Sequence, residues 1–191
     1  MAVEPEKKQQ QHWIYVLGGA DLNAKASRWA ERKTRQGKSY AVIEGAPPPN
    51  HAARLGEVKS DDVLYVFADA VRDGHLGEWR LSVAGLAGLL RSEGLDHGHR
   101  DLKIFASHSG DAHGSPCFAE QLYEALRADY PRIVVFGYLG QADAEGFDGH
   151  KTAGLAEHDS LNDMGREEWI KKKARAKDNR VQFPPAASVA S

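Results

Sequence analysis

The chain has very little cysteine, no long apolar run and almost no net charge, and each of these shortages excludes a class of protein. A single cysteine, Cys117, among 191 residues leaves no partner for an internal disulfide and cannot build a zinc site from several thiolates. No apolar run approaches the ~20 residues that a membrane-spanning helix needs. A formal net charge of −2 gives no general case for binding nucleic acid or a membrane surface.

The polar start of the chain bears on its location. Residues 1–12, MAVEPEKKQQQH, lack the apolar core of a cleavable secretory signal. We therefore expect the protein to be cytoplasmic in the cell that produces it, with export by a signal-independent secretion system left open.

What is present is the composition of an ordinary globular domain. Hydrophobic residues make up 41% of the chain and charged residues 27%, and 191 residues can bury one full core. We expect a flexible tail over 1–12, one α/β domain over 13–140, a loop-rich extension over 141–183 and a disordered tail over 184–191. Within the extension, residues 140–165 suggest loops with one short hairpin, and residues 166–176 suggest a basic helix.

Apolar runs of strand length alternate with segments of helical periodicity along the first 140 residues. The expected strands cover 13–17, 39–43, 63–68, 102–106 and 133–136, and the expected helices cover 22–36, 83–93 and 115–129. Such alternation is typical of βαβ units, and continuous apolar runs such as Val63–Phe67 suit strands that are covered on both faces. The sequence therefore predicts a three-layer α/β sandwich around a mostly parallel, doubly wound sheet.

Polar and nucleophilic side chains gather where the third and fourth expected strands end. They are Asp69, His75, Ser107, His108, Asp111 and His113. The carboxyl ends of parallel strands share one edge of the sheet, and ligands bind at that edge in open α/β sheets. By the same logic His97 and His99 precede a strand, so we expect them at the opposite edge in surface roles.

Nucleophilic hydrolysis is the first chemistry that these residues suggest. Ser107 could attack a carbonyl if His75 or His108 took its proton while Asp69 oriented that imidazole. The stretch lacks the Gly-x-Ser-x-Gly pattern of a nucleophile elbow, because Phe105 stands where the first glycine would be. The competing interpretation makes Ser107 a hydrogen-bonding residue at the end of a strand.

Cys117 is a second candidate nucleophile. We expect it in the first turn of a helix that begins at Ser115 and Pro116, where the helix dipole would lower the pKa of a thiol. The competing interpretation is that a small residue in this position simply packs on the sheet.

A metal site is the third possibility. His108, Asp111 and His113, joined by His75 or Asp69 from the next strand, would supply nitrogen and oxygen ligands for zinc or manganese. Loop spacing of this kind is equally compatible with structural histidines.

A basic run lies late in the chain. Residues 166–180 hold seven lysines and arginines against three acids. Lys171, Lys172, Lys173 and Arg175 in this run are candidate ligands for an anion such as a polyphosphate, and a solvated helix face is the alternative.

The segment Asp61–Gly140 also resembles a known family. It contains in order DDVLYVFADA, GHLGEWRLSVAGLAGLL, DLKIFASHSG, CFAEQLYEAL and RIVVFGYLG. This pattern is similar to the caspase-like, self-processing cysteine protease domains of MARTX and large clostridial toxins. In that family the third strand ends in a His-Gly pair, the fourth ends in the catalytic Cys, and the next helix reads close to SFAEQLA. The resemblance implies a caspase-like fold and binding of inositol hexakisphosphate through late Lys and Arg residues.

The chain departs from that family at both catalytic positions. Asp69-Ala70 stands where the His-Gly pair is expected, and Ser107 stands where the Cys is expected. A Cys-to-Ser substitution alone would not account for Asp69. We therefore predict a bacterial toxin- or effector-related pseudoenzyme that binds a protein partner or an anionic ligand. The alternatives are a peptidase-like hydrolase that uses Ser107 or Cys117, and a metal-dependent enzyme.

Overall fold

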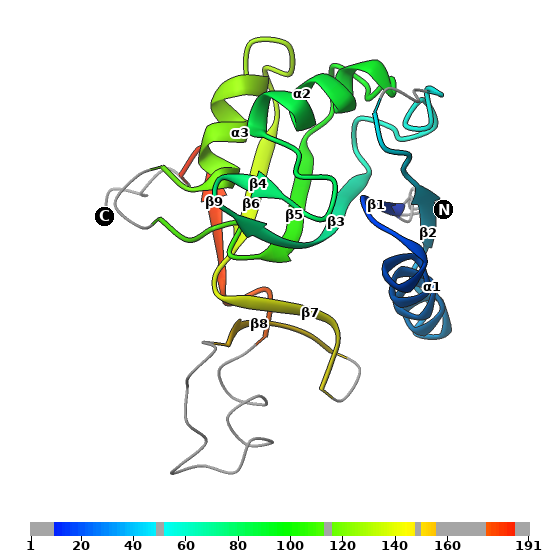
Figure 1. The fold of residues 1–191 in the computed structure, drawn as a ribbon. Helices are drawn as coiled ribbons and strands as arrows, with labels where there is room; N and C mark the ends of the chain where they lie inside the picture. The colour runs from blue at the N-terminus through cyan, green and yellow to red at the C-terminus, as the bar shows by residue number, and fades with distance from the viewer. Residues whose placement is uncertain (1–9, 49–51, 113–115, 148–149, 156–174, 186–191) are drawn as a thin grey trace, which may run out of the picture.

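The computed structural model describes residues 10–48, 52–112, 116–147, 150–155 and 175–185, and Figure 1 shows their arrangement. The strands are β1 (His12–Val16), β2 (Tyr40–Glu44), β3 (Val63–Arg72), β4 (His75–Leu76), β5 (Asp101–Ser107), β6 (Val134–Tyr138), β7 (Gln141–Phe147), β8 (His150–Leu155) and β9 (Arg180–Phe183). The helices are α1 (Ala20–Arg35), α2 (Val83–Ser92) and α3 (Phe118–Leu126). The predicted alternation of strands and helices is confirmed, with boundaries that differ by a few residues.

The central sheet is mixed but mostly parallel. Its strands follow the order β2-β1-β3-β5-β6-β9, and β4 pairs with β3 at the side. Strands β2, β1, β3, β5 and β6 are parallel to one another, whereas β9 runs antiparallel to β6 and β4 runs antiparallel to β3. From β1 the chain passes outward to β2 and then crosses to β3 on the other side. The switch point at which ligands bind in such sheets therefore lies between β1 and β3.

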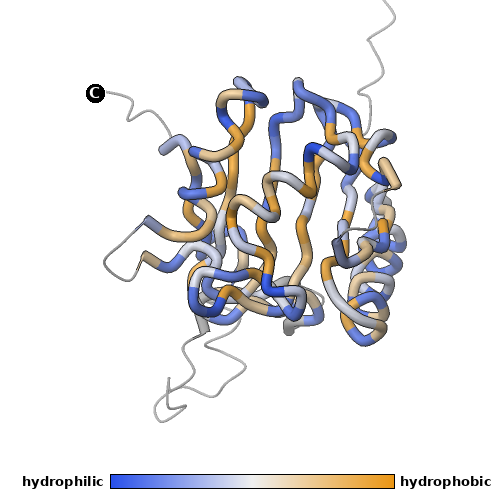
Figure 2. Tube along the Cα trace, turned by 45° about the horizontal axis from the view of Figure 1, so that its top comes forward, coloured by the Kyte–Doolittle hydropathy of each residue, from blue (hydrophilic) through white to orange (hydrophobic). Residues whose placement is uncertain are grey.

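Apolar layers cover both faces of this sheet because side chains alternate along each strand. Leu64 of β3 belongs to the core beneath α2 and α3, whereas its neighbour Tyr65 belongs to the core beneath α1. Trp29 anchors α1 in that second core, to which the β7–β8 hairpin adds Ala144. In Figure 2 the central strands are mostly apolar and the turns that join them mostly polar. The arrangement is compatible with the predicted three-layer sandwich.

Several local expectations change. The hairpin expected within 140–165 is present as β7 and β8, but β4 and β9 were not expected. Helix α3 begins at Phe118, with Cys117 as its N-cap, rather than at Ser115. Most of the basic helix expected over 166–176 lies outside the described residues, and its end is not helical, because Arg175 makes a β-bridge to Thr152. Within the described residues, no helix is both long and apolar enough to cross a membrane.

His99 overturns one expectation about the amino edge of the sheet. Its side chain is fully buried rather than on the surface. The ring places Nδ1 3.2 Å from the Lys59 carbonyl and Nε2 3.2 Å from the Asp101 carbonyl. One of these carbonyls can accept the single N–H of the neutral ring, which allows a polar side chain to be buried, and burial lowers the pKa of His99. His97 is exposed, as expected, and stacks on Tyr130.

Candidate functional site

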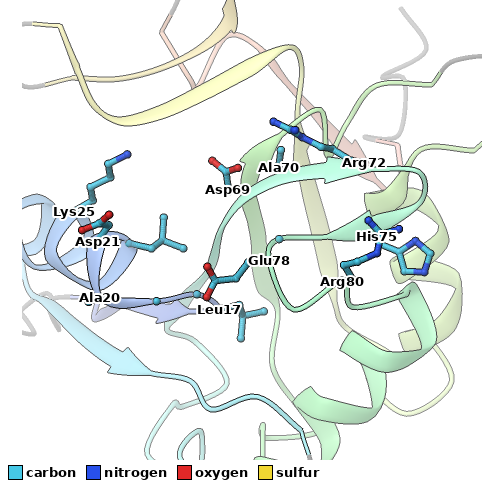
Figure 3. A pocket seen from close by; sticks show the side chains of 14 residues that line it. Leu17, Ala20, Asp21, Lys25, Asp69, Ala70, Arg72, His75, Glu78 and Arg80 are labelled. Atoms are coloured by element: carbon cyan, nitrogen blue, oxygen red, sulfur yellow. The ribbon is translucent and has the colours of Figure 1, made fainter.

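A large opening at the carboxyl edge of the sheet lies at the switch point. This switch-point cavity has a volume of about 630 Å³ and opens between the ends of β1 and β3 (Figure 3). Residues 17–22 and Lys25 line it on one side, and Asp69, Ala70, Arg72, His75, Gly77, Glu78 and Arg80 line it on the other. The sequence predicted a site at this edge, and the volume falls within the ~300–1,000 Å³ that is usual for ligand pockets.

The switch-point cavity carries charges of both signs. The acids are Asp21, Asp69 and Glu78, and the bases are Lys25, Arg72 and Arg80. In the part of the chain that the structure describes, none of the six forms an ion pair within 4.0 Å. Figure 3 shows the three carboxylates around one open space, with both arginines and His75 toward its other side. The cavity therefore offers unpaired charges to a ligand.

The β3–β4 hairpin forms one wall of this cavity. Its turn consists of Asp73 and Gly74, whose φ angles are +50° and +73°. An Asp-Gly pair suits such a turn because both central residues need positive φ. Sequence reasoning missed this hairpin and with it the roles of Arg72, Glu78 and Arg80. The Asp73-Gly74 pair between apolar residues is the signal that could have revealed them.

A second cavity lies on the other face of the same hairpin. Val71, Asp73 and Gly74 line it, whereas Arg72 and His75 line the switch-point cavity. This second opening, the His108 cavity, has a volume of about 420 Å³. Its other lining residues are His108, Asp111, Pro116, Cys117, Phe118 and Gln121.

His108 and Asp111 form a fixed pair at the end of β5. The distance from Nδ1 of His108 to Oδ2 of Asp111 is 2.7 Å. The Gly140 N–H donates to both carboxylate oxygens of Asp111, at 3.0 and 3.2 Å. The backbone N–H of His108 donates to the Gly140 carbonyl at 2.8 Å. The turn that follows β6 thus holds the Asp111 side chain and the backbone of His108.

Cys117 is buried at the amino end of α3, with 3% of its surface exposed. Burial raises the pKa of its thiol. The expectation of a lowered pKa is therefore wrong, because the cost of burying a thiolate exceeds the stabilisation that the helix terminus provides. At neutral pH the thiol is protonated.

Ser107 lines neither cavity. Its Oγ accepts a hydrogen bond from the Ala142 N–H at 3.0 Å, which ties the start of β7 to the end of β5. The residues of the hydrolase hypothesis thus do not meet in one cavity. Asp69 and His75 lie in the switch-point cavity, while His108 and Cys117 share the other.

The remaining candidate residues lie mostly beyond what the structure describes. His113 of the metal hypothesis is outside the described residues, and so are Lys171, Lys172 and Lys173. Among the described residues, no three His, Cys, Asp or Glu side chains are placed to hold a metal ion. Arg175 is exposed beside its bridge to Thr152.

Comparison with protein-family models finds no match to this chain, and a search of curated proteins finds no significant relative. The resemblance to the toxin protease domains therefore remains a hypothesis that rests on the motifs themselves.

Proposed function

We propose that the chain is a caspase-like domain, related to self-processing toxin proteases, that binds a charged segment of a partner protein without cleaving it. The observation that carries the proposal is the lining of the switch-point cavity. It offers three unpaired acids and three unpaired bases, but no serine, threonine or cysteine.

The order of the strands supports the relation to the toxin domains. The family's base and nucleophile follow neighbouring strands, which here correspond to β3 and β5. Ala70 of β3 pairs with Ser107 of β5, so the two positions meet at the same edge of the sheet. The observed sheet is mostly parallel, with helices on both of its faces. The caspase-like fold that the resemblance implies has a sheet of this kind.

The side chains at those two positions favour binding over cleavage. Asp69 offers an exposed carboxylate, which is a weaker base than the imidazole of the family. Ser107 offers a hydroxyl, which needs an adjacent base to become a nucleophile. Its Oγ instead accepts the Ala142 N–H. This pair would not activate a nucleophile as a His–Cys pair does.

The charges in the cavity indicate the chemistry of the partner. A ligand with charges of one sign would leave half of the six charged groups without a complement. A peptide segment that carries both acidic and basic side chains complements both sets. Its affinity would fall with rising salt because the groups that line the cavity are largely exposed.

A peptide with alternating Lys and Glu residues tests this function by fluorescence anisotropy. We expect saturable binding to the full chain, weakened at least about tenfold by Asp69→Asn combined with Glu78→Gln, since two charged contacts are lost. The control is Glu124→Gln, which removes an exposed carboxylate on α3. Equal affinity of the peptide for the wild-type chain and the double variant, or cleavage of the peptide, would contradict the proposal.

The same resemblance supports two further proposals. Inositol hexakisphosphate would bind the late basic run, which includes Lys171, Lys172, Lys173 and Arg175. The protein would act in the setting of a bacterial toxin or effector.

A further inference from the structure

We propose that the His108 cavity is a second site, in which His108 acts as general base for Cys117 in acyl transfer from a small ester or thioester, with Asp111 positioning the imidazole. This site goes beyond partner binding in the switch-point cavity. The β3–β4 hairpin separates the two cavities, so neither activity depends on the other.

The hydrogen bonds of His108 define which of its nitrogens can accept a proton. The Asp111 carboxylate can only accept hydrogen bonds when ionised, so Nδ1 of His108 carries the proton in their 2.7 Å contact. In the neutral imidazole the other nitrogen, Nε2, then carries the lone pair. Among the described residues, Nε2 has no hydrogen-bond partner. An imidazole in this state is a general base ready to accept a proton.

The backbone around this pair is held in an unusual conformation. His108 has a φ of +64°, in the left-handed region that is uncommon for residues other than glycine. Its N–H and the Asp111 carboxylate both bond to Gly140. Strain of this kind persists where the surroundings enforce it and is frequent at functional sites. Here it places the ring on a cavity, with about a third of the side chain exposed.

The same cavity is lined by a thiol that could use this base. Burial keeps Cys117 protonated at neutral pH, so the thiol is a poor nucleophile by itself. Cys117 lines the same cavity as His108 and Asp111. Phe118, the first residue of α3, also lines this cavity. The amino end of a helix carries a partial positive charge, which would stabilise the oxyanion that forms on an attacked carbonyl.

The reaction balances without an added oxidant or metal. The S–H bond of Cys117 breaks, and its proton passes to Nε2 of His108 as the sulfur bonds to the carbonyl carbon. The bond from that carbon to the leaving oxygen or sulfur then breaks, and the leaving group takes the proton from His108. Water, activated by the same base, hydrolyses the acyl–sulfur bond and restores the thiol.

The experiment uses the full chain and p-nitrophenyl acetate as the acyl donor. Mass spectrometry of the intact and digested protein should find one acetyl group, on Cys117. We expect His108→Ala to slow acetylation about 100-fold, since general bases contribute that much or more. His97→Ala is the matched control, because that exposed histidine precedes β5 at the opposite edge of the sheet, and it should leave the rate unchanged.

Asp111→Asn separates positioning from structural support. The asparagine oxygen can still accept the Gly140 N–H, so the turn keeps a partner. Its amide would donate to Nδ1 of His108 and force the proton onto Nε2, which removes the base. We expect acetylation of Cys117 to slow while the thermal unfolding temperature changes little.

The pH dependence of the wild-type chain keeps the proposal testable if a variant fails to fold. With a base that takes the thiol proton directly, acetylation should change little in the upper range from about pH 7.5 to about pH 9. A thiol that reacts without a base would instead accelerate about tenfold per pH unit through that upper range. That acceleration, acetylation elsewhere than Cys117, or an unchanged rate in His108→Ala would overturn the inference and leave the partner-binding proposal intact.

Discussion

Single hydrogen bonds decide what the polar residues at the carboxyl edge can do. Ser107 and Ser109 are two residues apart, and the hydroxyl groups of both form hydrogen bonds that stabilise the fold. Ser109 is fully buried, donates to the Ile104 carbonyl and accepts the Tyr138 N–H. Ser107 accepts the Ala142 N–H. His108, which lies between them, is held by Asp111, and its second ring nitrogen has no hydrogen-bond partner among the described residues.

Ser107→Ala tests the assignment of this serine to the fold. We expect the free energy of unfolding to fall by about 1 kcal/mol, because the Ala142 N–H loses its acceptor. Urea denaturation measures the loss, with Ser27→Ala at an exposed position of α1 as control. We also expect acetylation of Cys117 to continue in Ser107→Ala. A loss of that acetylation would mean that Ser107 takes part in chemistry.

His99 predicts how stability depends on pH. Burial lowers the pKa of His99 in the folded state, while nearby Asp101 and Asp62 oppose that shift. The unfolded chain therefore binds a proton more readily below about pH 6.5. Protonation of His99 should therefore leave the free energy of unfolding unchanged above that pH and should reduce it as the pH falls below it.

The measurement compares the wild-type chain with His99→Gln in urea at about pH 7.5 and about pH 5.5. The wild-type chain should lose more free energy of unfolding over this interval than the variant. An equal loss in both would show that His99 is not the group that titrates.

At the scale of elements, apolar runs determine most of the fold, and long-range pairing determines the rest. The central strands and all three helices could be predicted because each carries its own periodicity. Strand β4 has only two residues, and β9 follows a polar segment, so neither shows a pattern of its own. Both exist because β3 and β6 offer them hydrogen-bonding edges.

The end of α2 makes a prediction about ion pairs. Glu93 follows α2 and is fully buried, and it accepts both the Arg54 N–H at 2.9 Å and its guanidinium at 2.7 Å. Glu93→Ala should lower the free energy of unfolding by about 3 kcal/mol, because a partly buried arginine loses the buried carboxylate of Glu93. Asp129→Ala, which breaks the half-exposed pair with Arg91, should cost less than about 1 kcal/mol.

Chemical denaturation of the two variants measures both losses. Equal losses would mean that burial does not strengthen the Arg54–Glu93 pair.

At the scale of the whole molecule, the sequence predicts that the polar residues lie at the carboxyl edge of the sheet. It does not predict which of them line the switch-point cavity and which line the His108 cavity. Parallel strands bring Asp69 and His108 to one edge, as expected. The β3–β4 hairpin then separates them, because successive residues of a strand face opposite sides. The charged residues of the switch-point cavity come from separate parts of the chain: Asp21 and Lys25 from α1, Asp69 and Arg72 from β3, and Glu78 and Arg80 from the loop after β4. No local pattern predicts that these three segments meet.

Inositol hexakisphosphate should stabilise the chain if the late basic run acts as the resemblance implies. At 100 times its dissociation constant, the ligand adds about 2.7 kcal/mol, which raises the unfolding temperature by several degrees. A thermal-shift titration measures this effect, and changing Lys171, Lys172 and Lys173 to Ala should abolish it. The absence of a shift in the wild-type chain would remove this ligand from the account.

The central claim is that the switch-point cavity binds a charged peptide without cleaving it, and amide NMR shift mapping tests it most directly. The alternating Lys–Glu peptide should shift resonances of residues 17–22 and of the stretch from Asp69 to Arg80, and it should remain intact throughout the titration. Shifts centred elsewhere on the described fold, or fragments of the peptide, would contradict the claim.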